Sequence, residues 1–191
     1  MEEFEEKAIS VGQMLIEANP ENKGLGKDKI LQIKEKIYER IAEILVCEGY
    51  PTESMKDFKE ANVTDLVFTI IVPMIVAFRT WMGRKLQLHR EKTITAVDGK
   101  MGGFQEFVTI DLIGVGDQKY VFIVEAKKSS VGETKIQCLL PMKDMQSNNG
   151  GGVVFGFVTS GQQWQMIRFD GKNYTQTNTF DMLFHTRGFQ S

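Results

Sequence analysis

Two acidic residues and a lysine in the second half of the chain have the types and spacing that hydrolytic chemistry uses. Asp111 ends the segment 109–111, and Glu125 and Lys127 lie in the segment 123–127. Because side chains alternate between the two faces of a β-strand, Glu125 and Lys127 should project from one face, about 6–7 Å apart. Two carboxylates and an amine at the end of a buried strand are costly to desolvate unless something pairs with them. The pattern therefore predicts a charged cluster with a function.

A hard divalent cation is the partner that such carboxylates favour. Mg²⁺ (or Mn²⁺) takes oxygen ligands and keeps waters that a substrate phosphate can replace. The predicted ligands are Asp111, Glu125 and the backbone carbonyl of Ala126. Lys127 would orient or activate a water for in-line attack at phosphorus and stabilise the developing negative charge. The predicted chemistry is phosphodiester hydrolysis, and the competing interpretation is a structural ion network at a strand end.

The turn between the two strands decides whether Asp111 and Glu125 meet. Gly116-Asp117-Gln118 is a turn-forming segment between two apolar runs. A hairpin that reverses there pairs Asp111 with a residue near 123 to 125. We therefore expect the Asp111 carboxylate beside Glu125.

The other elements must bring these strands into one sheet. Helices, three strands, a helix and two strands follow one another, which indicates an α/β domain with a mixed sheet flanked by helices. A right-handed crossover through the predicted helix 132–147 should join the strand 119–127 to the strand 153–159. The predicted helices cover the residues before Asn19, then 28–48, 54–82 (interrupted near Asn62, bent or broken at Pro73) and 132–147, with a short packing helix around 180–184. The predicted strands cover 85–95, 104–115, 119–127, 153–159 and 163–169.

Composition limits the classes of function. The chain has 191 residues, of which 42% are apolar and 25% charged, with a formal net charge of −2. No overall positive field recruits nucleic acid, so a nucleic-acid-binding surface must be a local cluster of Lys and Arg. The two cysteines, Cys47 and Cys138, lie outside any CxxC arrangement, which argues against a zinc ribbon or a disulfide scaffold. Two histidines leave little material for a histidine-rich metal site.

The N-terminal sequence predicts an intracellular protein, cytoplasmic or nuclear. The first ten residues, MEEFEEKAIS, are acidic and lack the basic and apolar regions of a signal peptide. The longest apolar stretch, Leu66 to Phe78, has about 13 residues, which is too short to span a bilayer and predicts a buried helix. We expect no association with a membrane.

The order of these elements and residues resembles the PD-(D/E)XK, or restriction-endonuclease-like, superfamily. That family has a helix, three strands, a helix and a strand, with an aspartate on strand two and (D/E)XK on strand three. Asp111 matches the aspartate and Glu125-Ala126-Lys127 matches ExK, while Ile110 stands where the family commonly has proline. The match covers roughly residues 60 to 170. The run 153–165 is similar to segments of type I restriction-subunit-like nucleases and of fungal or crinkler-type nuclease domains.

The resemblance implies a Mg²⁺-dependent endonuclease that acts on DNA. It also implies an acidic residue from the helix before strand one or from strand one itself, for which Glu60, Asp65 and Glu91 are candidates. A polar residue, often glutamine, on the helix after ExK is implied as well, and Gln137 fits it. Thr134-x-x-Gln137 also fits a capping box, so both interpretations of Gln137 stay open.

The same resemblance divides the chain into a helical N-terminal extension, residues 1–55, and a PD-(D/E)XK nuclease-like domain, residues 56–191. The extension has three open roles: a cap, an element that forms a homodimer, or part of the helical cover of the core. The alternative function is a catalytically inactive nuclease-like module that binds nucleic acid or a protein partner. The negative net charge and the missing proline favour that alternative.

Overall fold

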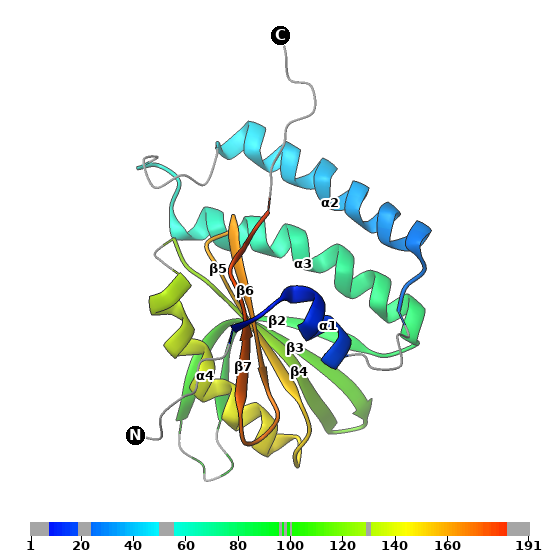
Figure 1. Ribbon diagram of the computed structural model, residues 1–191, viewed down its shortest axis with the longest axis vertical. Helices are drawn as coiled ribbons and strands as arrows, with labels where there is room; N and C mark the ends of the chain where they lie inside the picture. Colours follow the sequence, from blue (N-terminus) through cyan, green and yellow to red (C-terminus); the bar gives the residue numbers. More distant parts are fainter. Residues whose placement is uncertain are drawn as a thin grey trace.

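A computed structural model describes residues 8–18, 24–49, 56–95, 97, 99, 101–128 and 131–182. These residues form an α/β fold with a mixed, open sheet of eight strands and four helices (Figure 1). The helices are α1 (Val11–Ala18), α2 (Lys27–Glu48), α3 (Glu60–Met82) and α4 (Val131–Asn148). The strands are β1 (Ala8–Ile9), β2 (Leu86–Thr95), β3 (Met101–Gly114), β4 (Asp117–Ala126), β5 (Val154–Thr159), β6 (Gln163–Phe169), β7 (Tyr174–Thr177) and β8 (Phe180–Asp181).

The sheet combines antiparallel hairpins with one long crossover. Its strand order is β1-β7-β6-β5-β4-β3-β2, and β8 also pairs with β6. The neighbours β4 and β5 are parallel, and α4 connects them. A parallel pair requires such a crossover, because a tight turn can join only antiparallel strands. The mixed sheet is therefore confirmed. The helix predicted after the strand 119–127 is confirmed as well, as α4 between β4 and β5.

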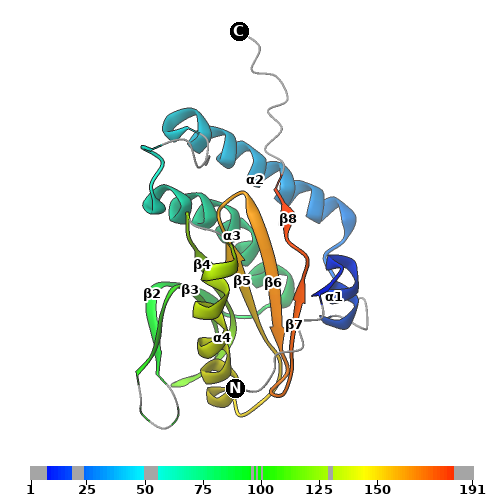
Figure 2. The same cartoon turned by 60° about the vertical axis from the view of Figure 1, so that its left-hand side comes forward.

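Neighbouring residues of the central strands face opposite helices. Phe107 of β3 belongs to a buried cluster with α3, whereas Val108 belongs to a second cluster with Met142 of α4. Strand β4 repeats this alternation, with Val124 in the first cluster and Ile123 in the second. The helices α2 and α3 therefore cover one face of the sheet and α4 covers the other (Figures 1 and 2).

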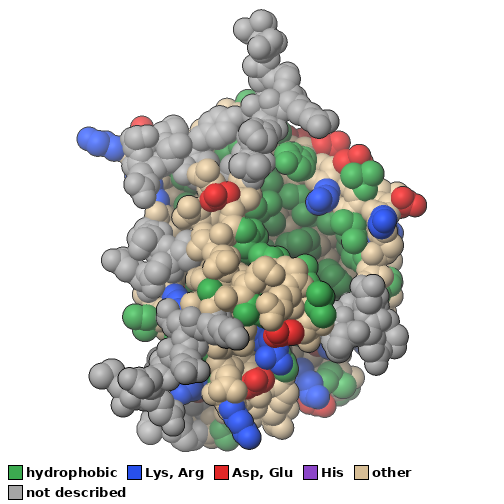
Figure 3. Space-filling model, in the orientation of Figure 1, with side chains coloured by type: hydrophobic (Ala, Val, Ile, Leu, Met, Phe, Trp, Pro, Cys, Tyr) green, Lys and Arg blue, Asp and Glu red, His purple; other side chains and the backbone are tan. Residues whose placement is uncertain are grey.

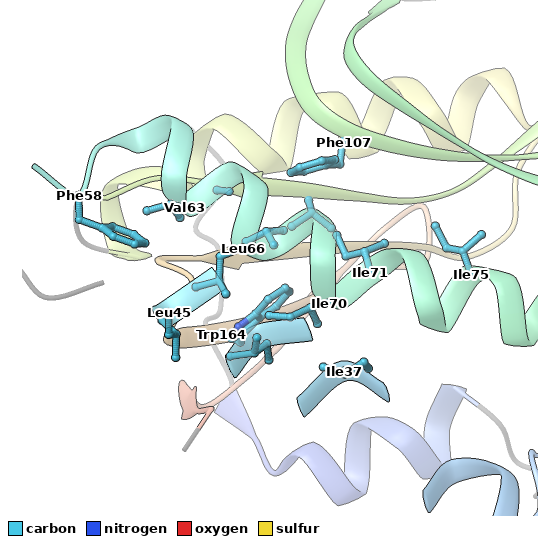
Figure 4. Packing of buried hydrophobic residues seen from close by; sticks show 14 of the residues in the cluster. Ile37, Leu45, Phe58, Val63, Leu66, Ile70, Ile71, Ile75, Phe107 and Trp164 are labelled. Carbon is cyan, nitrogen blue, oxygen red and sulfur yellow. The ribbon is translucent and has the colours of Figure 1, made fainter. Parts of the chain in front are cut away.

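The first cluster joins α2 to the rest of the domain. Figure 4 shows side chains of α3 between Phe107 of β3 and Ile37 of α2, and Leu45 of α2 and Trp164 of β6 belong to the same cluster. Each apolar side chain that is fully buried contributes about 1.5–3 kcal/mol. Helix α2 thus forms part of the helical cover, one of the three roles open to the extension. The boundary at residue 55 and a homodimer stay predictions.

Helix α3 begins at Glu60, later than the predicted start at residue 54. It is continuous through Asn62 and Pro73, where an interruption and a bend or break were predicted. The side chain of Asn62 accepts a hydrogen bond from the backbone N–H of Lys59 at 2.8 Å, so Asn62 helps to start the helix and does not interrupt it. Pro73 lies inside the continuous helix and is buried. Helix α3 is long and apolar enough to cross a bilayer by length and composition alone, and 44% of that stretch is buried within the fold.

The two ends of the described chain are strands where helices were predicted. Ala8 and Ile9 form β1, which pairs in parallel with β7, and the first helix begins only at Val11. Phe180 and Asp181 form β8 against β6, so the predicted packing helix is wrong there, and residues 183 and 184 lie outside the described residues. Both segments are short and lie beside strands with free edges, which offer backbone hydrogen bonds that a helical pattern cannot anticipate.

Candidate active site

The hairpin between β3 and β4 reverses earlier than predicted. Val115 and Gly116 form its turn, Gly114 pairs with Asp117, and Gly116 has a φ of +79°, which glycine adopts readily. Because turn position sets the register of a hairpin, and the pairing shifts by one residue between Gly114 and Leu112, Asp111 pairs with Lys119. The expectation that Asp111 pairs near 123 to 125 is wrong.

Asp111 also lies on the wrong face of the sheet. The pairing of β3 with β2 is regular from Gln105 to Asp111, so Asp111 shares the α3 face with Phe107. Its Oδ2 accepts a hydrogen bond from Nε of Arg84 at 2.7 Å, and Nη2 of Arg84 lies 2.6 Å from the same oxygen. Arg84 follows the end of α3. The Arg84–Asp111 pair therefore links the C-terminal end of α3 to strand β3. Asp111 does not lie beside Glu125.

Glu106 takes the position that Asp111 was expected to fill. Phe107 pairs with Val124, so the register sets Glu106 opposite Glu125, with both side chains on the α4 face. Oε2 of Glu106 accepts a hydrogen bond from the backbone N–H of Ala126 at 2.9 Å. This bond fixes one carboxylate directly beside the ExK segment.

Lys127 completes a group that we call the acid–lysine cluster: Glu106, Glu125 and Lys127. The Lys127 ammonium lies 3.2 Å from Oε1 of Glu106 and 2.5 Å from Oε1 of Glu60, the first residue of α3. Burial lowers the pKa of Lys127, but the bond to Glu60 and the charge of Glu106 outweigh burial and leave the pKa above its usual value. Lys127 is therefore a cation at neutral pH.

Glu125 is the most deeply buried group of the cluster. Only 2% of the residue is exposed, and its Oε1 has no hydrogen-bond partner. Burial, together with the charge of Glu106, raises the pKa of Glu125 to about 8, although the charge of Lys127 lowers it. Burial also raises the pKa of Glu106, against the opposing effect of Lys127. A bound cation would favour ionisation of both carboxylates.

The donor set suits a hard cation. Glu106 and Glu125 offer carboxylate oxygens, and the unpartnered Oε1 of Glu125 is a buried acceptor that a cation would satisfy. Within the ranges that the structure describes, no three side chains of His, Cys, Asp or Glu are grouped to hold a metal ion. A cation held here would therefore complete its coordination with backbone oxygen and water, as Mg²⁺ commonly does.

The cluster opens into a cleft of about 590 Å³. Helix α3, strands β2, β3 and β4, and helix α4 all contribute to its lining. The lining residues are Glu60, Thr64, Arg90, Glu91, Phe104, Gln105, Glu106, Glu125, Lys127, Ile136, Gln137, Leu140 and Pro141. A cleft of this size accommodates a nucleotide-sized ligand.

The structure separates the open interpretations of Gln137. Helix α4 begins at Val131, so Thr134 lies inside the helix and not at its N-cap. The capping box is therefore not formed by Thr134 and Gln137. Gln137 is exposed and lines the cleft together with Glu125 and Lys127.

The three candidate upstream acids have different surroundings. Glu60 contacts Lys127, and Asp65 accepts a hydrogen bond from Arg90 at 3.1 Å without lining the cleft. Glu91 lines the cleft on β2 and has a φ of +53°, a conformation uncommon for a residue with a side chain. Glu60 is therefore the candidate that reaches the acid–lysine cluster.

Sequence reasoning missed Glu106. A signal was available, because a two-residue turn at Val115-Gly116 pairs position 106 with position 125. Neither a scan against protein-family models nor a search of curated proteins finds a match for this chain.

Proposed function

We propose that this chain hydrolyses phosphodiester bonds in DNA with Mg²⁺ (or Mn²⁺), as an endonuclease of the PD-(D/E)XK type. One observation carries the proposal: a buried glutamate with an unpartnered oxygen, Glu125, and a partly buried glutamate of the neighbouring strand, Glu106, lie with a lysine in an open cleft. The order α3-β2-β3-β4-α4-β5 supports the family resemblance. In this proposal Glu106, and not Asp111, supplies the first acid.

The residues of the cleft would divide the work. Glu106, Glu125 and the backbone carbonyl of Ala126 would hold the cation. When bound, Mg²⁺ polarises a phosphoryl oxygen and makes a hydroxide nucleophile accessible near neutral pH. Because the pKa of Lys127 is raised, its ammonium is suited to stabilise negative charge on the phosphate and not to remove a proton from water.

Two further side chains would position the reactants. Glu60 holds the ammonium of Lys127 through the hydrogen bond from Lys127, so Glu60 acts as a positioning residue. Gln137 projects from α4 into the cleft, where its amide can donate a hydrogen bond to a phosphate oxygen. Both residues act in the proposed reaction through orientation and not through covalent chemistry.

The test compares Glu106 with Asp111. Purified protein should cut DNA with Mg²⁺ or Mn²⁺ and stop when EDTA is added. Glu106→Gln should abolish cutting, whereas Asp111→Asn should retain it at a temperature where the variant stays folded, as measured by circular dichroism. Cutting that survives Glu106→Gln, or that continues in EDTA, would contradict the proposed site.

The second candidate function is an inactive module that binds nucleic acid or a protein. Two observations favour it: Lys127 is held by two carboxylates, and the described residues include no group of three metal-binding side chains. On the face shown in Figure 3, the described Lys and Arg side chains are interspersed with Asp and Glu and form no continuous basic track. Calorimetry with Mn²⁺ separates the candidates, because an inactive module should bind no divalent ion at the cluster.

A further inference from the structure

Three apolar side chains at the cleft are unusually exposed. Phe104 on β3 is 60% exposed, and Ile136 and Leu140 on α4 are 74% and 61% exposed. All three line the same cleft as Glu106 and Glu125. Ile136 and Leu140 are four residues apart on one helix, so they lie on the same side of α4. We call these three residues the apolar rim.

The cations that line the cleft are already engaged. Among the described lining residues they are Arg90 and Lys127. Arg90 donates a hydrogen bond to Asp65 at 3.1 Å, and its guanidinium lies 5.1 Å from the ring centroid of Phe68. Lys127 is held by Glu60 and Glu106. The lining therefore offers exposed apolar surface and little free positive charge.

This combination suits unpaired bases better than a continuous duplex. In a duplex the base faces are stacked on one another, so a protein mainly meets phosphates and binds them with Lys and Arg. In a single strand the base faces are open, and aromatic and apolar side chains can pack on them. An apolar rim beside a phosphodiester-cleaving centre is therefore suited to pack against bases that are not stacked in a DNA duplex.

We propose that the apolar rim binds unstacked bases, so that the cleft selects single-stranded ends or tails of DNA. The inference rests on the proposed nuclease function for the identity of the substrate. It assigns Phe104, Ile136 and Leu140 as determinants of specificity, with the phosphate next to the bound base directed toward the acid–lysine cluster.

The test measures binding separately from cutting. In a Glu125→Gln background, which should remove hydrolysis, fluorescence anisotropy compares a blunt duplex with the same duplex carrying an oligo-thymidine tail. The tailed probe should bind about tenfold more tightly. Phe104→Ala, and the double variant Ile136→Ser with Leu140→Ser, should each remove most of that preference. Ile113→Ser is the matched control, because Ile113 is an exposed apolar residue of β3 outside the cleft.

The outcomes separate this inference from the proposed function. Equal binding of both probes, rim variants that keep the preference, or an equal loss in Ile113→Ser would each overturn the base-binding role. Rim-dependent binding of the tail without cutting by the unmodified protein supports the rim and contradicts the nuclease. Cutting of both probes at equal rates, unaffected by rim substitutions, supports the nuclease and contradicts the rim. Thermal unfolding of every variant checks that the fold is kept.

Discussion

Strand β3 carries two acidic side chains, five positions apart, that lie on opposite faces of the sheet in different surroundings. On the α3 face, Asp111 is paired with Arg84 through two close contacts. On the α4 face, Glu106 shares Lys127 with Glu60, and its neighbour Glu125 keeps an unpartnered oxygen. Both regions bury a carboxyl group, but Asp111 is neutralised by Arg84, whereas burial keeps Glu125 protonated at neutral pH. The comparison teaches that a satisfied buried acid serves the fold, whereas an unsatisfied one beside a cleft indicates a ligand.

The largest expected effect is on cutting by Glu125→Gln. The amide is close in shape to the carboxylate but carries no charge for a cation, so the rate should fall by about 10³-fold or more. Rates with Mg²⁺ and with Mn²⁺ measure this loss. Asp117→Asn, a change of the same kind at an exposed position of the β3–β4 hairpin, is the control and should cut normally. A tenfold loss or less would place the essential acid elsewhere.

The next effect is a dependence of stability on pH in the acid–lysine cluster. The pKa of Glu125 is about 8 in the folded chain against an ordinary 4.5, so between these values the folded state holds a proton that the unfolded state has released. The contribution of Glu125 to stability is therefore full below pH 4.5, falls by on the order of a few kcal/mol as pH rises from 4.5 to 8, and is constant above 8. The groups that face Glu125 are Glu106, Lys127, Glu60 and Cys138.

Urea unfolding in EDTA across this range measures that slope. Glu125→Gln should flatten most of it and should be the more stable protein at high pH, because the buried charge is gone. Added Mn²⁺ should restore stability to the unmodified protein at high pH, since a ligand that binds only the folded state stabilises it. Identical slopes in the two proteins would show that Glu125 ionises normally.

A smaller effect, on the free energy of unfolding, is expected when the Arg84–Asp111 pair is broken. Arg84→Met leaves the Asp111 carboxylate buried without its partner, and the side chain of Arg84 is 41% exposed while that of Asp111 is 8% exposed. Removing one member of a fully buried pair costs about 3–5 kcal/mol, so this half-exposed pair should cost about 2 kcal/mol. Urea unfolding measures the loss, and cutting at low temperature should be unchanged. Lost cutting in the folded variant would mean that the two regions are coupled.

The smallest expected effect comes from Gln137→Ala. Gln137 is exposed on α4, so its truncation should change the free energy of unfolding by less than about 0.5 kcal/mol. If its amide contacts a phosphate, cutting should fall about tenfold, the equivalent of roughly one hydrogen bond to a charged group. Ser147→Ala, at an exposed position near the other end of α4, provides the control. An unchanged rate would leave Gln137 without a role in the reaction.

Much of the fold was accessible from local patterns. Apolar runs and turn-forming segments predicted the strands from β2 to β6 and the long α2 and α3, because burial and backbone conformation are encoded over a few residues. The residues of the candidate site could be predicted only in part from the sequence. Alternation along a strand is local, so the sequence grouped Glu125 with Lys127, and both residues line the cleft. The first acid was misidentified, because a turn displaced by one to two residues changes the partner strand's register.

The sequence by itself determined an α/β chain with an ExK segment at the end of a central strand, since these features depend on residues close together in the chain. Only the tertiary structure decided which acid joins that segment. Asp111 and Glu106 are both acids within one strand, and they differ in the face on which they lie. That choice depends on where the hairpin turns and which helix covers each face, and both are settled by contacts between distant parts of the chain.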